Sequence, residues 1–223
     1  MSVFVLKLIG IISMFFDHTG YIIYKNFTFM NYIGRFAFPI FAFLITEGFI
    51  HTRDVKKYFL RLFLFALISQ APYMLFISTF TSIFELNILF TFCLSLLMLI
   101  LLEKINNKFL KILIVIFTCI IAQAFKFDYG WFGIATIFIF YKFKDNKILM
   151  NTLFVLSALI LNLIRFINTS YSYNFIFFFL FYLIALLFIN LYNGKKGKSI
   201  KYFFYIFYPT HLIVLYLISL LLN

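Results

Sequence analysis

The stretch Leu6–Tyr21, LKLIGIISMFFDHTGY, is an apolar segment that carries an aspartate and a histidine side by side near its end. A charged aspartate at the centre of a membrane span costs roughly 2.5 to 3.5 kcal/mol to insert, so such a pair indicates function by default. Asp17 and His18 are therefore the first candidate catalytic residues. The alternative is that the span ends a few residues later and that both side chains are solvated near the lipid headgroups.

Composition predicts an integral membrane protein with helical spans. Hydrophobic residues make up 65% of the 223-residue chain, which contains 37 phenylalanines. A helical span needs about 20 apolar residues, whereas a β-barrel would show alternation with period two. We expect an all-α, polytopic membrane helix bundle in which residues 1–223 form a single membrane domain. The apolar runs predict nine spans: Val3–Tyr24, Asn31–Ile50, Lys57–Ser78, Leu86–Leu102, Phe109–Phe125, Tyr129–Phe143, Ile148–Ile167, Asn174–Leu191 and Ile200–Leu222.

The lysines and arginines predict the orientation of the spans, because cytoplasmic loops retain basic residues. With nine spans, fifteen of the nineteen basic residues fall on one side, and only Lys25, Arg35, Lys126 and Arg165 fall on the other. This bias predicts a multi-pass protein of the cell membrane with its N-terminus inside and its C-terminus outside. Orientation accounts for the net charge of +12, so we expect no nucleic-acid partner. The first helix lacks a small-residue cleavage site and is expected to remain as an anchor.

Depth and helical phase relate residues of the first two spans. Lys7 and His18 are eleven residues apart, which is about 16.5 Å along a helix and about 20° around it, so they share a face at opposite depths. Arg35 enters from the outer side and reaches a depth similar to that of Asp17 and His18. Its guanidinium stays charged and needs a partner within a membrane. That partner is Asp17, a substrate carbonyl or phosphate, or both.

The second span, GRFAFPIFAFLITEG at Gly34–Gly48, combines small residues with a proline. Gly34 allows close approach of another helix. Pro39 predicts a kink, because it cannot donate a backbone hydrogen bond. At the inner end, Glu47 and His51 either belong to a solvated loop or line a cavity.

The third span opens with KKYFLRLFLFALISQAPY, which places a basic face at the inner membrane surface. Lys56, Lys57 and Arg61 stand at helical spacing. They suit the phosphates of a nucleotide-bearing substrate or anionic lipid. The alternative for each of them is that it snorkels to the headgroups without a specific ligand.

Three further motifs carry polar residues inside apolar surroundings: NILFTF with Asn87, DYGWFG with Asp128 and YPTHL with His211. Asp128 either caps a helix or takes part in binding. His211 is expected near mid-membrane, as a packing residue or as a member of a polar pocket. Cys93 and Cys119 lie in apolar runs without CxxC spacing, so we expect buried thiols and neither a disulfide nor a metal site.

These motifs, in this order and together with the DH pair of the first span and GRFAFPIFAFLITEGF, resemble the TraX family over essentially the whole chain. The resemblance implies acyl transfer, because the family's named member is associated with N-terminal acetylation of conjugative pilin. TraX is more distantly similar to transmembrane acyltransferases such as the acyltransferase-3 group of O-acetylases and the lysosomal heparan glucosamine acetylase. In that group a basic residue, ten intervening positions and a histidine mark the first span, which Lys7 and His18 match. Lys57 and Arg61 match its donor-phosphate motif loosely.

Acyl transfer needs a base near the acceptor, and imidazole is the best-suited side chain near neutral pH. We expect His18 to be this base, with a partner from elsewhere in the chain such as Asp128. Asp17 is expected to hold Arg35 across the helix interface. Arg35 and Asn87 are candidates for stabilising charge on the thioester oxygen. The catalytic candidates are His18, Asp17 and Arg35, and the substrate- or donor-binding candidates are Lys7, Glu47, Lys57, Arg61, Asn87, Asp128 and His211.

The expected donor is acetyl-CoA or another acyl-CoA that arrives from the cytosol as a substrate, with no bound cofactor. Its phosphates would lie near the basic face, and its arm would pass between helices toward the outer half of the membrane. The acceptor would be an amine, such as a protein N-terminus, or a hydroxyl of a saccharide or of the cell envelope. The lipid bilayer is the remaining partner.

Two other classes of protein stay open. Ionisable residues along a bundle are also typical of a proton-coupled transporter of small molecules or lipids, which predicts pH-dependent uptake without CoA. The fourth, seventh and eighth spans are poor in polar groups for a hydrophilic pathway. A structural component of a larger assembly would tolerate polar substitutions.

Overall fold

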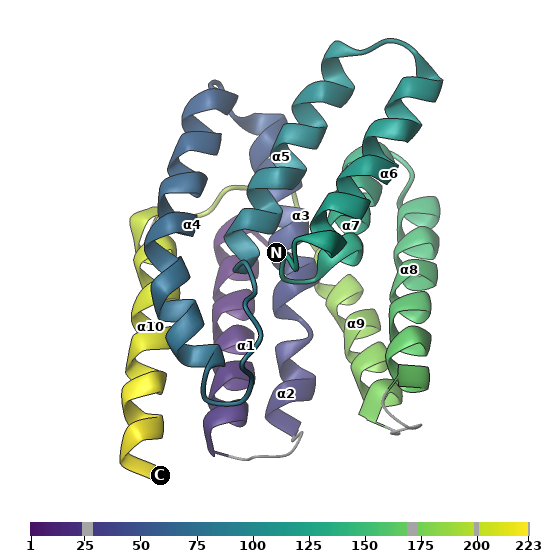
Figure 1. Cartoon of the computed structure of the whole chain (residues 1–223). Helices are drawn as coiled ribbons and strands as arrows, with labels where there is room; N and C mark the ends of the chain where they lie inside the picture. Colours follow the sequence, from purple (N-terminus) through teal and green to yellow (C-terminus); the bar gives the residue numbers. More distant parts are fainter. Residues whose placement is uncertain (24–28, 169–173, 199–200, 223) are drawn as a thin grey trace.

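Helices make up almost all of the fold. The computed structural model describes residues 1–23, 29–168, 174–198 and 201–222. Apart from an isolated bridge between Leu86 and Phe127, these residues form no strand, and the predicted all-α fold is confirmed. Figure 1 shows a bundle in which α1, α4 and α10 lie at one side and α8 and α9 at the other. The helices are α1 (Val3–Ile23), α2 (Phe29–Gly34), α3 (Ala37–His51), α4 (Val55–Ile77), α5 (Ile88–Lys104), α6 (Lys108–Ala124), α7 (Gly130–Lys142), α8 (Lys147–Asn168), α9 (Asn174–Asn190) and α10 (Lys201–Leu222).

The predicted spans coincide with these helices to within two residues at each end, with α2 and α3 together forming the second span. The predicted ends at Tyr24 and Ile200, and the basic residue Lys25, lie outside the described residues. Five helices are long and apolar enough to cross a membrane: α1, α2 with α3, α4, α8 and α10. The chain is therefore a helical membrane protein, while nine spans with the N-terminus inside stay a prediction.

The second predicted span is broken rather than kinked, and the break precedes the proline. Arg35 and Phe36 form a two-residue turn between α2 and α3, closed by bonds from Arg35 N to Tyr32 O (3.0 Å) and from Phe36 N to Ile33 O (3.1 Å). Pro39 has no N–H to donate to the carbonyl four residues earlier, which is that of Arg35. The missing bond therefore coincides with the turn that carries the guanidinium.

Aromatic side chains form the core around α3. This helix packs against α1, α5, α7 and α9, and most of its residues are buried. Behind it, Phe132, Phe140, Phe154 and Tyr182 are inaccessible to solvent. The Phe140 and Phe154 rings lie 5.3 Å apart and the Phe132 and Tyr182 rings 5.6 Å apart, within the range for favourable ring pairs. A helix that is apolar all round is thus placed inside the bundle, as expected for its composition.

The start of α1 is joined to the loop that leads into α10. Val3 N donates to Lys195 O (2.9 Å), Phe4 N donates to Lys196 O (3.2 Å) and Asn193 N donates to Met1 O (2.9 Å). We call this set of three backbone hydrogen bonds the N-terminal clasp. It fixes the start of α1 to the segment between α9 and α10.

Candidate functional site

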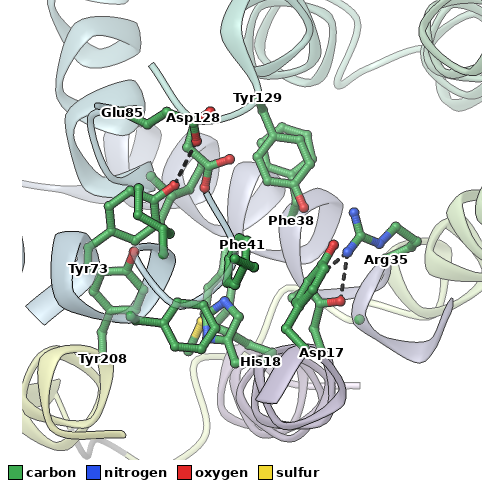
Figure 2. A pocket seen from close by; sticks show the side chains of 18 of the residues that line it. Asp17, His18, Arg35, Phe38, Phe41, Tyr73, Glu85, Asp128, Tyr129 and Tyr208 are labelled. Atoms are coloured by element: carbon green, nitrogen blue, oxygen red, sulfur yellow. Dashed lines mark hydrogen bonds and ion pairs between the residues drawn. The ribbon is translucent and has the colours of Figure 1, made fainter. Parts of the chain in front are cut away.

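A cavity of about 230 Å³ lies among α1, α3, α4 and α10 and the loops that follow α4 and α6. Figure 2 shows Asp17 and Arg35 on one wall, Glu85, Asp128, Tyr73 and Tyr208 on the opposite wall, and His18 between them. The cavity therefore brings together polar side chains from distant parts of the chain. Its lining residues are Met14, Asp17, His18, Tyr21, Gly34, Arg35, Ala37, Phe38, Phe41, Tyr73, Phe76, Ile77, Phe80, Glu85, Ile88, Phe92, Asp128, Tyr129, Arg165 and Tyr208.

The first wall is a buried ion pair between α1 and the turn after α2. Arg35 Nη2 donates to both carboxylate oxygens of Asp17, at 2.7 and 2.8 Å. Asn31 Nδ2 donates to the Asp17 carbonyl (3.0 Å) and to Oδ1 (3.2 Å), and Arg35 Nε donates to Asn31 O (3.1 Å). Both charged residues are less than one-tenth exposed. The predicted ion pair is confirmed.

Gly34 makes this contact possible. A Cβ atom at Gly34 would lie 2.3 Å from the Cβ and Cγ atoms of Asp17, closer than real contacts allow. The predicted close approach of two helices at Gly34 is therefore confirmed, and its purpose is to admit the carboxylate of Asp17.

The opposite wall holds two carboxyl groups on loops that are fastened together. Leu86 N donates to Lys126 O (3.0 Å) and Asp128 N donates to Leu86 O (2.9 Å), which joins the loop after α4 to the loop after α6. Tyr73 donates its hydroxyl to Glu85 Oε2 (3.2 Å). Burial raises the pKa of the Asp128 carboxyl to about 7, the charge of Glu85 adds to this rise, and the positive charge of Arg35 opposes it.

His18 has a partner that the sequence did not predict. Its Nδ1 atom lies 2.7 Å from Nε2 of His211 on α10, and Nδ1 of His211 lies 2.8 Å from the carbonyl oxygen of Phe207. The suggestion that Asp128 partners His18 is therefore wrong. Proximity could not be foreseen, because His18 and His211 are 193 residues apart in the chain.

Asn87 does not line the cavity and is fully buried. Its Oδ1 accepts from Leu89 N (3.0 Å) and so caps α5, while its Nδ2 donates to Ala66 O and to Gln70 Oε1, both at 2.8 Å. Both amide hydrogens of Asn87 are therefore engaged in holding α5 against α4. The expectation that Asn87 stabilises the thioester oxygen is wrong for this reason.

Four other predicted binding residues lie away from the cavity, near the beginnings of α1 and α4 and the end of α3. Glu47 pairs with His51 one helical turn further on (3.7 Å). Lys57 is exposed and pairs with Asp54 (3.4 Å). None of the lining residues is Lys7, Glu47, Lys57 or Arg61, so this cavity does not extend to the basic face.

Helix α10 covers the space between the basic residues of α1 and α4. Lys7 Nζ lies 4.9 Å from the centre of the Phe204 ring, and the Arg61 guanidinium is close enough to Tyr205 to interact with it electrostatically. Tyr205 also stacks on Phe65 of α4, with ring centres 4.7 Å apart. A donor arm entering from this side must therefore separate α10 from α1 and α4.

Sequence reasoning missed several cavity residues. Tyr73 and Tyr208 were hidden among fifteen tyrosines and 37 phenylalanines, where no single aromatic stands out. Glu85 was visible as one of only seven acidic residues in the chain. An acidic residue in the loop directly before an apolar helix, as Asp128 also is, was the available signal for this wall.

Neither the cysteines nor the other potential metal ligands form a second site within the described residues. Cys93 and Cys119 are free thiols, and no three His, Cys, Asp or Glu residues of the described ranges converge on one point.

Known proteins resemble the chain over most of its length. The family described as TraX protein matches residues 2–219. Over 146 residues the chain is 34% identical to a probable fimbrial assembly protein, FimC of serogroup H1, from Dichelobacter nodosus. That match covers 60% of this chain and 57% of the relative, so the chain spans little more than half of the relative's length. No solved structure matches the chain.

Proposed function

The chain belongs to the TraX family, and from this premise and the cavity we propose that it is a membrane-embedded acyltransferase of the cell membrane. It moves an acetyl or other acyl group from cytosolic acyl-CoA to an acceptor at the outer half of the bilayer. One observation carries the proposal: a histidine, two arginines and three carboxylic acids line a single cavity of about 230 Å³.

An amine is the acceptor that the cavity suits best. Glu85 and Asp128 bring negative charge to one wall, which favours binding of an ammonium group. A hydroxyl acceptor could hydrogen-bond to these carboxyl groups but would lack the charge attraction. The similarity to a probable fimbrial assembly protein supports a protein as the acceptor.

The residues can be given roles in a balanced reaction. The ionised carboxylate of Asp128 binds the ammonium and takes one proton, which frees the nitrogen lone pair. The nitrogen attacks the thioester carbonyl, an N–C bond forms, and the charge that develops on the carbonyl oxygen is stabilised by Arg35. His18 takes the second proton from the nitrogen. The C–S bond breaks, the CoA thiolate leaves with the electron pair, and His18 returns its proton to the sulfur.

Donor binding would use the basic residues at the opposite ends of α1 and α4. Arg61 and Tyr73 lie on the same helix, twelve residues or about 18 Å apart. The phosphates of acyl-CoA would bind near Lys57 and Arg61, and the pantetheine arm would reach toward His18. Because α10 covers this route, binding requires α10 to move.

Proton-coupled transport is the second candidate function. The observation that favours it is a cavity among the helices that holds titratable side chains and does not extend to the basic face. Transport predicts pH-dependent uptake into vesicles without CoA. Acyl transfer predicts CoA release that depends on the acceptor.

The test uses the full chain, purified and reconstituted in liposomes with labelled acetyl-CoA. CoA release is followed with a peptide that has a free N-terminus, with the same peptide N-blocked, and with an alkyl glucoside. We expect release with the free amine, and a loss of roughly 10²- to 10⁴-fold in the His18→Ala variant. His51→Ala is the matched control, because His51 is exposed and lies outside the cavity. Full transfer by His18→Ala would refute the proposal.

A further inference from the structure

The two buried histidines lie edge to edge in nearly one plane. Their ring planes differ by 1°, the ring centres are 5.0 Å apart, and the facing nitrogens, Nδ1 of His18 and Nε2 of His211, are 2.7 Å apart. The centre separation exceeds the N···N distance by about one ring radius at each end, so the rings meet at their edges and do not stack. This is the geometry of a straight N–H···N hydrogen bond.

The carbonyl of Phe207 determines which nitrogen carries each proton. A carbonyl oxygen only accepts, so Nδ1 of His211, at 2.8 Å, must carry a hydrogen. In a neutral ring, Nε2 of His211 then holds the lone pair and accepts from Nδ1–H of His18. In turn, a neutral His18 holds its own lone pair on Nε2.

The remaining nitrogen of His18 is available to a substrate. Within the described ranges, Nε2 of His18 has no hydrogen-bond partner. It is also not one of the unpaired polar atoms that are inaccessible to solvent, so a ligand can reach it. His18 is a lining residue of the cavity. The lone pair therefore belongs to the atom that can receive a proton there.

We propose that His211 is a positioning residue for the transfer reaction: it holds His18 in the Nδ1–H tautomer, so that the basic Nε2 is available in the cavity. The catalytic part of this inference rests on the proposed function. The assignment of the tautomer rests on the hydrogen bonds alone. When Nε2 of His18 takes the acceptor's proton, Nδ1–H stays bonded to the lone pair of His211, which stabilises the imidazolium. The proton then goes to the departing thiolate, and His211 neither gains nor loses one.

The surroundings of His211 suit this role. The residue is 5% exposed, and its ring stacks on that of Phe207, with centres 4.8 Å apart and planes 11° apart. His211 also borders a second cavity, almost entirely apolar, whose other lining residues are Phe15, Phe203, Ile206, Phe207, Thr210 and Val214. The hydroxyl of Thr210 is itself engaged with Ile206 O (2.8 Å). Apart from His211, the lining of this second cavity contains no titratable side chain that would compete with His18 for the proton.

The test reads the tautomer directly. The chain has three histidines, so ¹⁵N labelling of histidine in detergent-solubilised full-length protein gives few signals, and His51 serves as an exposed reference. At mildly alkaline pH, where free imidazole is neutral, we expect His18 to show a protonated Nδ1 and an unprotonated Nε2. His211→Phe keeps a ring and removes the acceptor, so His18 should become a mixture of tautomers. His211→Gln supplies an acceptor oxygen and should restore the wild-type pattern.

Rates are measured on the same variants. His211→Phe should lower kcat by about tenfold or more, up to the roughly 10²- to 10⁴-fold that a general base contributes, with KM for acyl-CoA unchanged. His211→Gln should recover most of this loss, and Thr210→Val should match wild type. An unchanged His18 tautomer in His211→Phe, or equal loss in the Phe and Gln variants, overturns the inference. A wild-type protein with the expected tautomer and no transferase activity refutes the proposed function and leaves the positioning intact.

Discussion

Two acid–base pairs lie in the first two predicted spans, and they behave differently. Asp17 and Arg35 come from α1 and the turn after α2, meet at 2.7 Å, and have side chains that are 12% and 8% exposed. Glu47 and His51 are four residues apart on α3, lie 3.7 Å apart, and the His51 side chain is 69% exposed. The first pair depends on how helices pack, whereas the second follows from helical spacing alone.

The comparison teaches that residue type does not identify a site in an apolar chain. Both pairs drew attention in the sequence because acids and bases are rare there, although Glu47 and His51 could equally belong to a solvated loop. Only the pair that joins separate elements faces a cavity. A helix-local pair at the bundle end is instead a modest surface interaction.

Removing the acid from each pair should give the largest contrast. Asp17→Asn leaves the Arg35 guanidinium buried without its counter-charge, and should lower the free energy of unfolding by about 3 to 5 kcal/mol. Glu47→Gln should lower it by less than about 1 kcal/mol, because the partner is exposed. Denaturant unfolding in mild detergent, followed by circular dichroism, measures both. Equal losses would contradict the difference in burial.

The glycine that admits Asp17 gives the next test. Gly34→Ala places a Cβ 2.3 Å from the Asp17 side chain, and should cost about 1 to 3 kcal/mol of stability and reduce transfer. Gly10→Ala on α1 meets the end of the Phe41 ring at 3.0 Å, which can move, so its effect should be smaller. Unfolding and CoA release are measured for both variants. A larger effect at Gly10 would show that the ion pair tolerates displacement.

Glu85 and Asp128 in the cavity should make the rate of transfer depend on pH, whereas the exposed Glu47–His51 pair should not. Asp128 has a pKa raised to about 7, so below that pH it is neutral and cannot hold an ammonium, and transfer should rise as pH increases through about 7. Glu85→Gln removes a nearby negative charge and should shift this rise to lower pH, whereas Glu47→Gln should leave it in place. Asp128→Asn should abolish the rise. The pH dependence is measured as CoA release across pH 5.5–8.5. An unchanged midpoint in Glu85→Gln would show that the charge of Glu85 does not affect the titration of Asp128.

The smallest effect is expected at the basic end. Lys57→Gln should raise KM for acyl-CoA about two- to fivefold with kcat unchanged, because an exposed charge contributes up to about 1 kcal/mol. Lys144, in the loop after α7, is the control, since it is exposed and distant in sequence from the basic face. The difference between the two variants should shrink at high salt. An equal KM for acyl-CoA in the Lys57 and Lys144 variants would show that the donor does not bind near Lys57.

Helix positions could be predicted because apolar length decides them. Asn174–Asn190 and Lys201–Leu222 lie within a residue of the predicted spans, since polar breaks mark where helices end. The Asp17–Arg35 pair was also within reach, because a permanently charged side chain in an apolar span requires a counter-charge nearby. Both inferences use local or single-pair physics.

Pairings across the whole chain could not be predicted. The contact of His18 with His211 depends on α10 packing beside α1, which no residue pattern specifies. Asn87 was misread because a helix cap and a binding amide share one residue type, and only the neighbours Ala66 and Gln70 distinguish them. The turn at Arg35 was displaced from Pro39 because proline acts on the carbonyl four residues before it.

The N-terminal clasp gives the first and last helices a common origin. His18 is fifteen residues beyond Val3, which is part of the clasp, and His211 is ten residues beyond Lys201, where α10 begins. Adding one residue to either helix before its histidine would raise that ring by about 1.5 Å and rotate it by about 100°. Three backbone hydrogen bonds at one end of the bundle thus help to fix the relative depth of α1 and α10, which the contact between the two imidazoles requires.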